Sequence, residues 1–100
     1  MKTTIEKTEG SALITLEGSL DSYIADEVEK ALEPVFEYSD TDITLDCTNL
    51  EYIASSGLRL FLYLLQQVEP RGCHVYVKGA NKMLMDIFES TGFKRWFNFK

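Results

Sequence analysis

The chain has 100 residues, 45% of them hydrophobic, and its formal net charge is −6. This composition excludes a disordered chain and fits one domain over residues 1–100, while the acidic balance argues against nucleic acid as a partner. The longest apolar run, residues 60–65, is too short to span a bilayer, and no apolar targeting core is found near the start, so we expect a cytoplasmic protein that does not act at a membrane.

The sequence begins with two segments that predict β-strands. Residues 3–7 form a weaker strand pattern and residues 11–17 a stronger one, with a turn at Glu9-Gly10 between them. Gly18–Ser22 is rich in residues that interrupt regular structure. We therefore expect the second strand to end before Gly18.

An amphipathic helix is expected next. Asp21 and Ser22 are candidate caps, because their side-chain oxygens can accept hydrogen bonds from the first free amides of a helix. Pro34 should kink or end the helix, since it lacks an amide hydrogen and clashes with the preceding turn. The apolar face recurs every three to four residues and comprises Ile24, Val28, Ala31, Leu32 and Val35.

The second half of the sequence alternates strands with helices. It begins with a strand over residues 42–47 and an irregular loop over 48–53. A deeply buried helix ending at Pro70 comes next, followed by a strand over 73–77. The sequence closes with a helix capped by Gly79–Asn81 and a terminal strand over 93–100. The predicted order is β-β-α-β-α-β-α-β. Such alternation implies parallel pairing, so we expect an α/β fold with a mixed β-sheet and helices packed mainly on one face.

The sequence contains two cysteines and one histidine, the side chains that make up the common spaced metal motifs. Cys47 and Cys73 both lie in apolar, strand-like runs, and together with His74 they do not have the spacing of a metal motif. We expect two reduced, buried thiols and neither a metal nor a cofactor. No His-Asp-Ser set and no phosphate-binding glycine loop is visible, so we do not expect an enzyme.

Charge is unevenly distributed along the chain. Residues 1–51 carry 13 acidic and 3 basic side chains, whereas residues 52–100 carry 3 acidic and 7 basic ones. This asymmetry is typical of ordinary solvated helix faces. The alternative is an acidic face that steers a basic partner.

The segment Ala54-Ser55-Ser56-Gly57 stands immediately before the apolar helix of the second half. Ser55 or Ser56 can cap that helix, and Gly57 allows another part of the backbone to approach closely. Taken by itself, a Ser-Ser-Gly sequence at this place is more often a helix cap than a binding site.

Four motifs in this chain together resemble the STAS domain of bacterial anti-sigma factor antagonists. They are G-S-L-D at 18–21, a strand with Asp, an aromatic and S-S-G-L over 43–58, Gly79-Ala80, and S-T-G-F at 90–93. The resemblance covers nearly the whole chain. It implies a regulatory protein that binds a serine kinase of the ATP-binding regulatory type, which also acts as the anti-sigma factor, and a serine phosphatase that reverses the phosphorylation.

By position, the resemblance implies that Ser55 is the phosphorylated residue. Arg59 lies one helical turn further on, where it can pair with a phosphate. Ala54 replaces the acidic residue that the family usually has before this serine, so a STAS module without phosphorylation, serving as a scaffold or binding a small ligand, is the alternative. The implied partner-binding surface comprises Asp21, Ser22, Ala54, Ser55, Ser56, Gly57 and Arg59.

Overall fold

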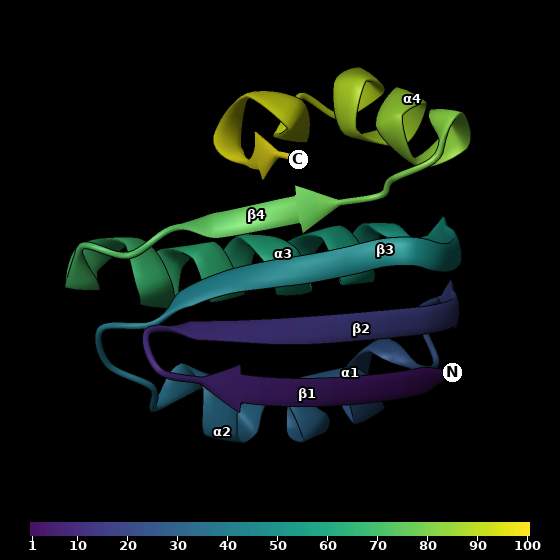
Figure 1. Cartoon of the computed structure of the whole chain (residues 1–100). Helices are drawn as coiled ribbons and strands as arrows, with labels where there is room; N and C mark the ends of the chain where they lie inside the picture. The colour runs from purple at the N-terminus through teal and green to yellow at the C-terminus, as the bar shows by residue number, and fades with distance from the viewer.

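The computed structural model describes all 100 residues as one α/β unit (Figure 1). Its elements are β1 (Lys2–Thr8), β2 (Ser11–Leu20), α1 (Ala25–Ala31), α2 (Glu33–Phe36), β3 (Asp42–Ile53), α3 (Ser55–Val68), β4 (Val75–Lys78), α4 (Lys82–Ser90) and β5 (Asn98–Phe99). Two 3₁₀ turns, η1 (Glu69–Arg71) and η2 (Phe93–Trp96), follow α3 and α4. The predicted order of strands and helices is confirmed. None of the helices combines the length and the apolar character that crossing a bilayer requires.

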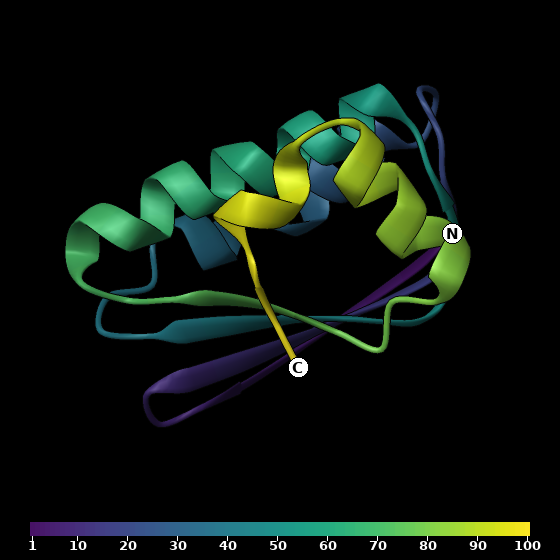
Figure 2. The same cartoon turned by 90° about the horizontal axis from the view of Figure 1, so that it is seen from above.

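The five strands form one mixed sheet in the order β1-β2-β3-β4-β5. β1 pairs antiparallel with β2 through a tight turn, whereas β2, β3, β4 and β5 are mutually parallel. Each parallel connection crosses over through helical structure, as parallel strands require. Seen from above, every helix lies on the same face of the sheet, and the other face is bare (Figure 2). The predicted mixed sheet with helices on one face is therefore confirmed.

The core lies between the sheet and this helical layer. Val28, Leu32 and Val35 are buried as predicted, but Ala31 is exposed and Ala25 takes its place in the core. The buried positions therefore recur at i, i+3, i+7 and i+10 from Ala25, which is a neighbouring stripe to the predicted one. Pro34 lies in the first turn of α2, so the predicted helix is divided just before it.

Two strands are longer than the sequence predicts. β2 continues through Gly18 to Leu20, and the expected loop over residues 48–53 is the second half of β3. The two extensions pair with each other, with Glu17 opposite Asn49 and Leu20 opposite Ile53, across two register irregularities. Neither segment shows a clear strand pattern in its own sequence. Each forms a strand because the other supplies its hydrogen-bond partners.

The C-terminal region also differs from the prediction. The expected strand over residues 93–100 is mostly the turn η2, and β5 has only two residues. This turn places Phe97 in the core, where its ring packs edge-on against Phe61 and Phe88. The gain in buried aromatic area explains why a turn replaces the strand.

The two cysteines have different surroundings, although both are free. Cys47 is buried, and its burial raises the pKa of the thiol to about 12, so that it remains protonated at neutral pH. Cys73 is only half-buried and precedes β4, which begins at Val75. The prediction of two buried thiols is therefore wrong for Cys73.

The connection between β4 and α4 is fixed against the middle of β3. Asp46 Oδ1 accepts hydrogen bonds from the Thr48 amide and hydroxyl, at 3.0 and 2.6 Å. These bonds hold the pKa of the Asp46 carboxyl below its usual value. Gly79, with φ of +72°, lies so close to Thr48 that a Cβ there would stand 2.2 Å from Thr48 Oγ1. Only glycine fits both the conformation and the space.

Candidate functional site

The start of α3 lies at the carboxyl ends of the parallel strands, at the right-hand edge of the sheet in Figure 1. The Ala54 amide donates a hydrogen bond to the Leu20 carbonyl oxygen at 2.8 Å. This bond joins the residue before α3 to the last residue of β2. The turn over residues 21–24 is therefore held beside the start of α3, although the two segments are some thirty residues apart in the sequence.

No side chain caps this helix start. Ala54 is the N-cap residue, with φ −86° and ψ 171°, and no side-chain oxygen accepts from the first turn. The prediction that Ser55 or Ser56 caps the helix is wrong, because both already lie within the first helical turn. The first intrahelical bond joins the Leu58 amide to the Ala54 carbonyl oxygen at 3.0 Å. The earlier amides of α3 remain free to bind an acceptor.

Gly57 brings this helix start against the ends of β2 and β3. A Cβ at Gly57 would lie 2.8 Å from both Leu20 Cγ and Ile53 Cγ1. Both of those side chains are buried in the core. The predicted close approach is confirmed, and it fixes the position of the two preceding serines relative to the sheet.

The two serines differ in accessibility, which the sequence could not show. Ser55 is exposed to solvent. The Ser56 hydroxyl is buried and has no hydrogen-bond partner. Of the two hydroxyl groups at this helix start, the one on Ser55 is therefore free to meet a second protein.

Asp21 organises the neighbouring turn. Its Oδ1 accepts hydrogen bonds from the Tyr23 and Ile24 amides, at 2.9 and 3.0 Å. Asp21 thus caps the turn before α1, whereas Ser22 is exposed, makes no side-chain hydrogen bond and is not a cap. Tyr23, which the sequence did not single out, is 91% exposed and belongs to this same turn before α1.

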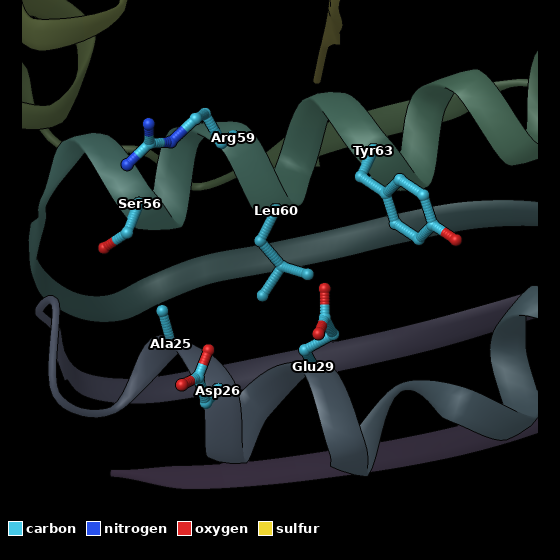
Figure 3. Close-up of a pocket in the computed structure, with 7 residues that line it drawn as sticks. All are labelled: Ala25, Asp26, Glu29, Ser56, Arg59, Leu60 and Tyr63. Carbon is cyan, nitrogen blue, oxygen red and sulfur yellow. The ribbon is translucent and has the colours of Figure 1, made fainter.

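A groove with a volume of about 250 Å³ separates α1 from the first half of α3 (Figure 3). Asp26 and Glu29 point into it from α1, and Arg59 and Tyr63 line it from α3. The guanidinium group of Arg59 extends back toward the start of α3, and it forms no ion pair with either carboxylate. The remaining lining residues are Ala25, Ser56 and Leu60.

The sequence reading identified Arg59 but missed the two carboxylates opposite it. Asp26 and Glu29 are three residues apart, a spacing that places both on one face of a helix. That pattern could have been noticed. Which helix this face meets depends on the packing of α1 beside α3, and the sequence gives no signal for that.

Comparison with known proteins gives consistent matches over the chain. The model of the STAS domain family matches residues 2–100. An anti-sigma-B factor antagonist from Staphylococcus aureus is 32% identical over 77 residues, which cover 77% of this chain and 71% of that protein. These are similarities in sequence.

Solved structures show the same fold. The anti-sigma factor antagonist SpoIIAA in its unphosphorylated form superposes with a TM-score of 0.83 at 18% identity, over 99% of this chain and 88% of that one. The Bacillus cell fate determinant SpoIIAA in its phosphorylated form gives a TM-score of 0.75, also at 18% identity, over 99% of this chain and 91% of that one. At such low identity, these likenesses concern the fold alone.

Proposed function

This chain belongs to the STAS domain family, and on that premise we propose that it is an anti-sigma factor antagonist, a regulatory protein that acts by binding rather than by catalysis. The observation that carries the proposal is the exposed Ser55 on a helix start that no side chain caps. An interaction switch needs a modifiable group that is accessible and whose surroundings tolerate new charge. Ser55 meets both requirements.

The partner is a serine kinase of the ATP-binding regulatory type that also serves as the anti-sigma factor. It contacts the surface formed by Asp21, Ser22, Ala54, Ser55, Ser56, Gly57 and Arg59. Binding withdraws the kinase from its sigma factor, and phosphorylation of Ser55 ends the binding. A serine phosphatase restores the unmodified form, and the whole cycle takes place in the cytoplasm.

The surroundings of Ser55 favour a phosphate without loss of the fold. The free amides of the first turn and the positive end of the helix dipole both stabilise a negative group there. The guanidinium of Arg59 extends back toward this end of α3 and is free of any other ion pair. Modification therefore adds about −1.5 to −2 charges to the surface while the core stays unchanged.

The groove between α1 and α3 indicates why the added charge weakens binding. Asp26 and Glu29 already make this surface acidic, so the complementary surface of the kinase is basic close to the groove. A phosphate on Ser55 draws Arg59 toward itself and rearranges the charges that the kinase meets. The effect on the partner is local charge and bulk at the contact.

Purified chain incubated with candidate kinases and ATP tests the proposal by intact mass and by binding. The expected result is one added phosphoryl group with the cognate kinase, lost in Ser55→Ala and retained in Ser56→Ala, whose hydroxyl is buried. The unmodified chain should bind the kinase and the phosphorylated chain should not. Failure of every regulatory kinase of the source organism to bind would contradict the proposal.

Ala54 supports a second candidate function, a STAS module that is never phosphorylated and serves as a scaffold or binds a small ligand. An acidic residue at this position would help to orient the serine hydroxyl or to recruit the kinase, and alanine does neither. The same experiment distinguishes the two candidates. A kinase that binds this chain tightly but adds no phosphate to Ser55 favours the scaffold.

A further inference from the structure

A second groove runs along the other side of α3, between this helix and η2. In Figure 2, η2 lies in yellow beside the teal α3. The groove has a volume of about 420 Å³ and shares no residue with the groove between α1 and α3. Its lining comprises Leu62, Leu65, Gln66, Glu69, Arg95 and Trp96.

Trp96 is the most prominent side chain of this groove. It is the single tryptophan of the chain and is 41% exposed. Its ring lies against Phe93, with centroids 5.2 Å apart, and the Arg95 guanidinium stands 5.2 Å from the ring centroid. A tryptophan held in place by its neighbours loses little entropy on binding, and tryptophan and arginine dominate the binding energy of protein interfaces.

The two charges of the groove have opposite signs, and neither forms an ion pair within the chain. Lys94 and Glu89 form the one ion pair of the structure, so Glu69 and Arg95 are both unpaired. In a symmetric dimer the same patch of two copies meets, and residue i contacts residue j while j contacts i. An apolar centre flanked by one acid and one base is complementary to itself in such an arrangement.

We propose that this groove is the interface of a symmetric dimer, in which Trp96 and Leu62 of two copies pack together and Glu69 of each copy pairs with Arg95 of the other. The patch is small, and small interfaces form transient complexes. Monomer and dimer therefore exchange readily.

The charges of the groove itself balance. Its lining contains one acid, Glu69, and one base, Arg95, whereas 13 of the 16 acidic side chains belong to residues 1–51. Since the groove between α1 and α3 is on the other side of the helix, a dimer presents two Ser55 sites to its partners and binds an oligomeric partner with avidity.

Sedimentation velocity of the full chain, from micromolar to millimolar concentration, tests the proposal together with tryptophan emission. The expected result is a rise to twice the monomer mass and no further. Emission should shift to the blue over the same concentration range, because Trp96 is the only tryptophan and loses contact with water at the interface.

A charge exchange tests the pairing itself. Glu69→Arg and Arg95→Glu, each alone, should weaken the dimer about tenfold or more, because like charges then face each other. The variant with both changes should restore the dimer, since the two pairs form again with reversed signs. Trp96→Ala should weaken it about thirtyfold. Met83→Ala, another exposed apolar side chain outside the groove, is the control and should leave the dimer unchanged.

Four results would overturn the proposal, provided that far-ultraviolet circular dichroism confirms the fold of each variant. They are a mass that stays at one subunit, an assembly larger than a dimer, a dimer insensitive to Trp96→Ala, and a double variant as weak as the single ones. Trp96 emission that ignores concentration but shifts on addition of a kinase would likewise refute the dimer and assign the groove to the kinase. The Ser55 phosphorylation experiment is independent of all these outcomes.

Discussion

The starts of α3 and α4 are built differently, although both helices follow a parallel strand at the same edge of the sheet. In α4 the N-cap is Asn81, whose Oδ1 accepts a hydrogen bond from the Leu84 amide at 2.9 Å. In α3 the N-cap is Ala54, and the corresponding amide, that of Gly57, has no side-chain acceptor.

The third residue of each helix repeats the contrast. Leu84 extends a side chain into the core, where it is fully buried. Gly57 has no side chain, and the backbone itself packs against Leu20 and Ile53. The start of α4 is thus saturated and structural, whereas that of α3 is closely packed toward the sheet and left open toward solvent. The proposed modification of Ser55 rests on this second arrangement.

Truncation of the buried Leu84 side chain at the start of α4 should have the largest effect on stability. Leu84→Ala leaves a cavity in the core and should lower the free energy of unfolding by about 2–5 kcal/mol. Urea denaturation followed by circular dichroism measures this loss. Met83→Ala, one residue earlier and 46% exposed, is the matched control and should change stability only slightly. A similar loss in both variants would contradict the assignment of Leu84 to the core.

Enlargement of Gly57 should have the next largest effect. Gly57→Ala places a methyl group against Leu20 and Ile53 and should lower the free energy of unfolding by about 1–3 kcal/mol, even though alanine favours a helix more than glycine does. Ser55→Ala, two residues earlier and exposed, is the control. If Gly57→Ala were as stable as the original chain, the close approach to the sheet would be wrong.

Exchange of the two caps should give smaller effects of opposite sign. Asn81→Ala should lower the free energy of unfolding by about 1 kcal/mol, and Ala54→Asn should raise it by a similar amount. The second change also occupies the free amides, so any stabilisation by a negative group at Ser55 should shrink. Thermal denaturation of the two variants and of their combination measures this. A destabilising Ala54→Asn would mean that the amides of α3 are not free.

A negative charge at Ser55 should give a still smaller stabilisation. Ser55→Asp should raise the free energy of unfolding by about 0.3–1 kcal/mol at low salt, because the helix dipole favours an anion there. Added salt should reduce this gain. Ser56→Asp should instead destabilise the fold, since the Ser56 hydroxyl is buried. Loss of tertiary structure in Ser55→Asp would contradict the proposed switch.

The smallest effect should be a pH dependence of stability caused by the Asp46 carboxyl in β3. The hydrogen bonds from Thr48 hold the pKa of the Asp46 carboxyl in the folded state below its usual value. The carboxylate therefore contributes stability at pH values above the pKa of the unfolded chain, and this contribution is lost as pH falls through the lower, folded-state pKa. Thr48→Val should weaken the acid-dependent loss in a titration of stability below pH 4, whereas Thr8→Val, on the exposed end of β1, should not.

The sequence by itself determined the order of elements, the position of the α4 cap and the division of the first helix at Pro34. These features depend on interactions within a few residues, such as the hydrogen bond from Asn81 to Leu84 or the missing amide hydrogen of proline. The motif around Ser55 could also be recognised from the sequence, because its residues are adjacent in the chain.

Only the tertiary structure decided which of the two serines is exposed, what α1 places opposite Arg59, and where β2 and β3 end. The Ser56 hydroxyl is buried at a helix start that Gly57 allows to approach the sheet, and residues 48–53 form a strand because residues 17–20 pair with them. Asp26 and Glu29 face α3 because the chain crosses over one face of the sheet. Each of these outcomes depends on contacts between segments distant in the sequence, and no local pattern specifies such contacts.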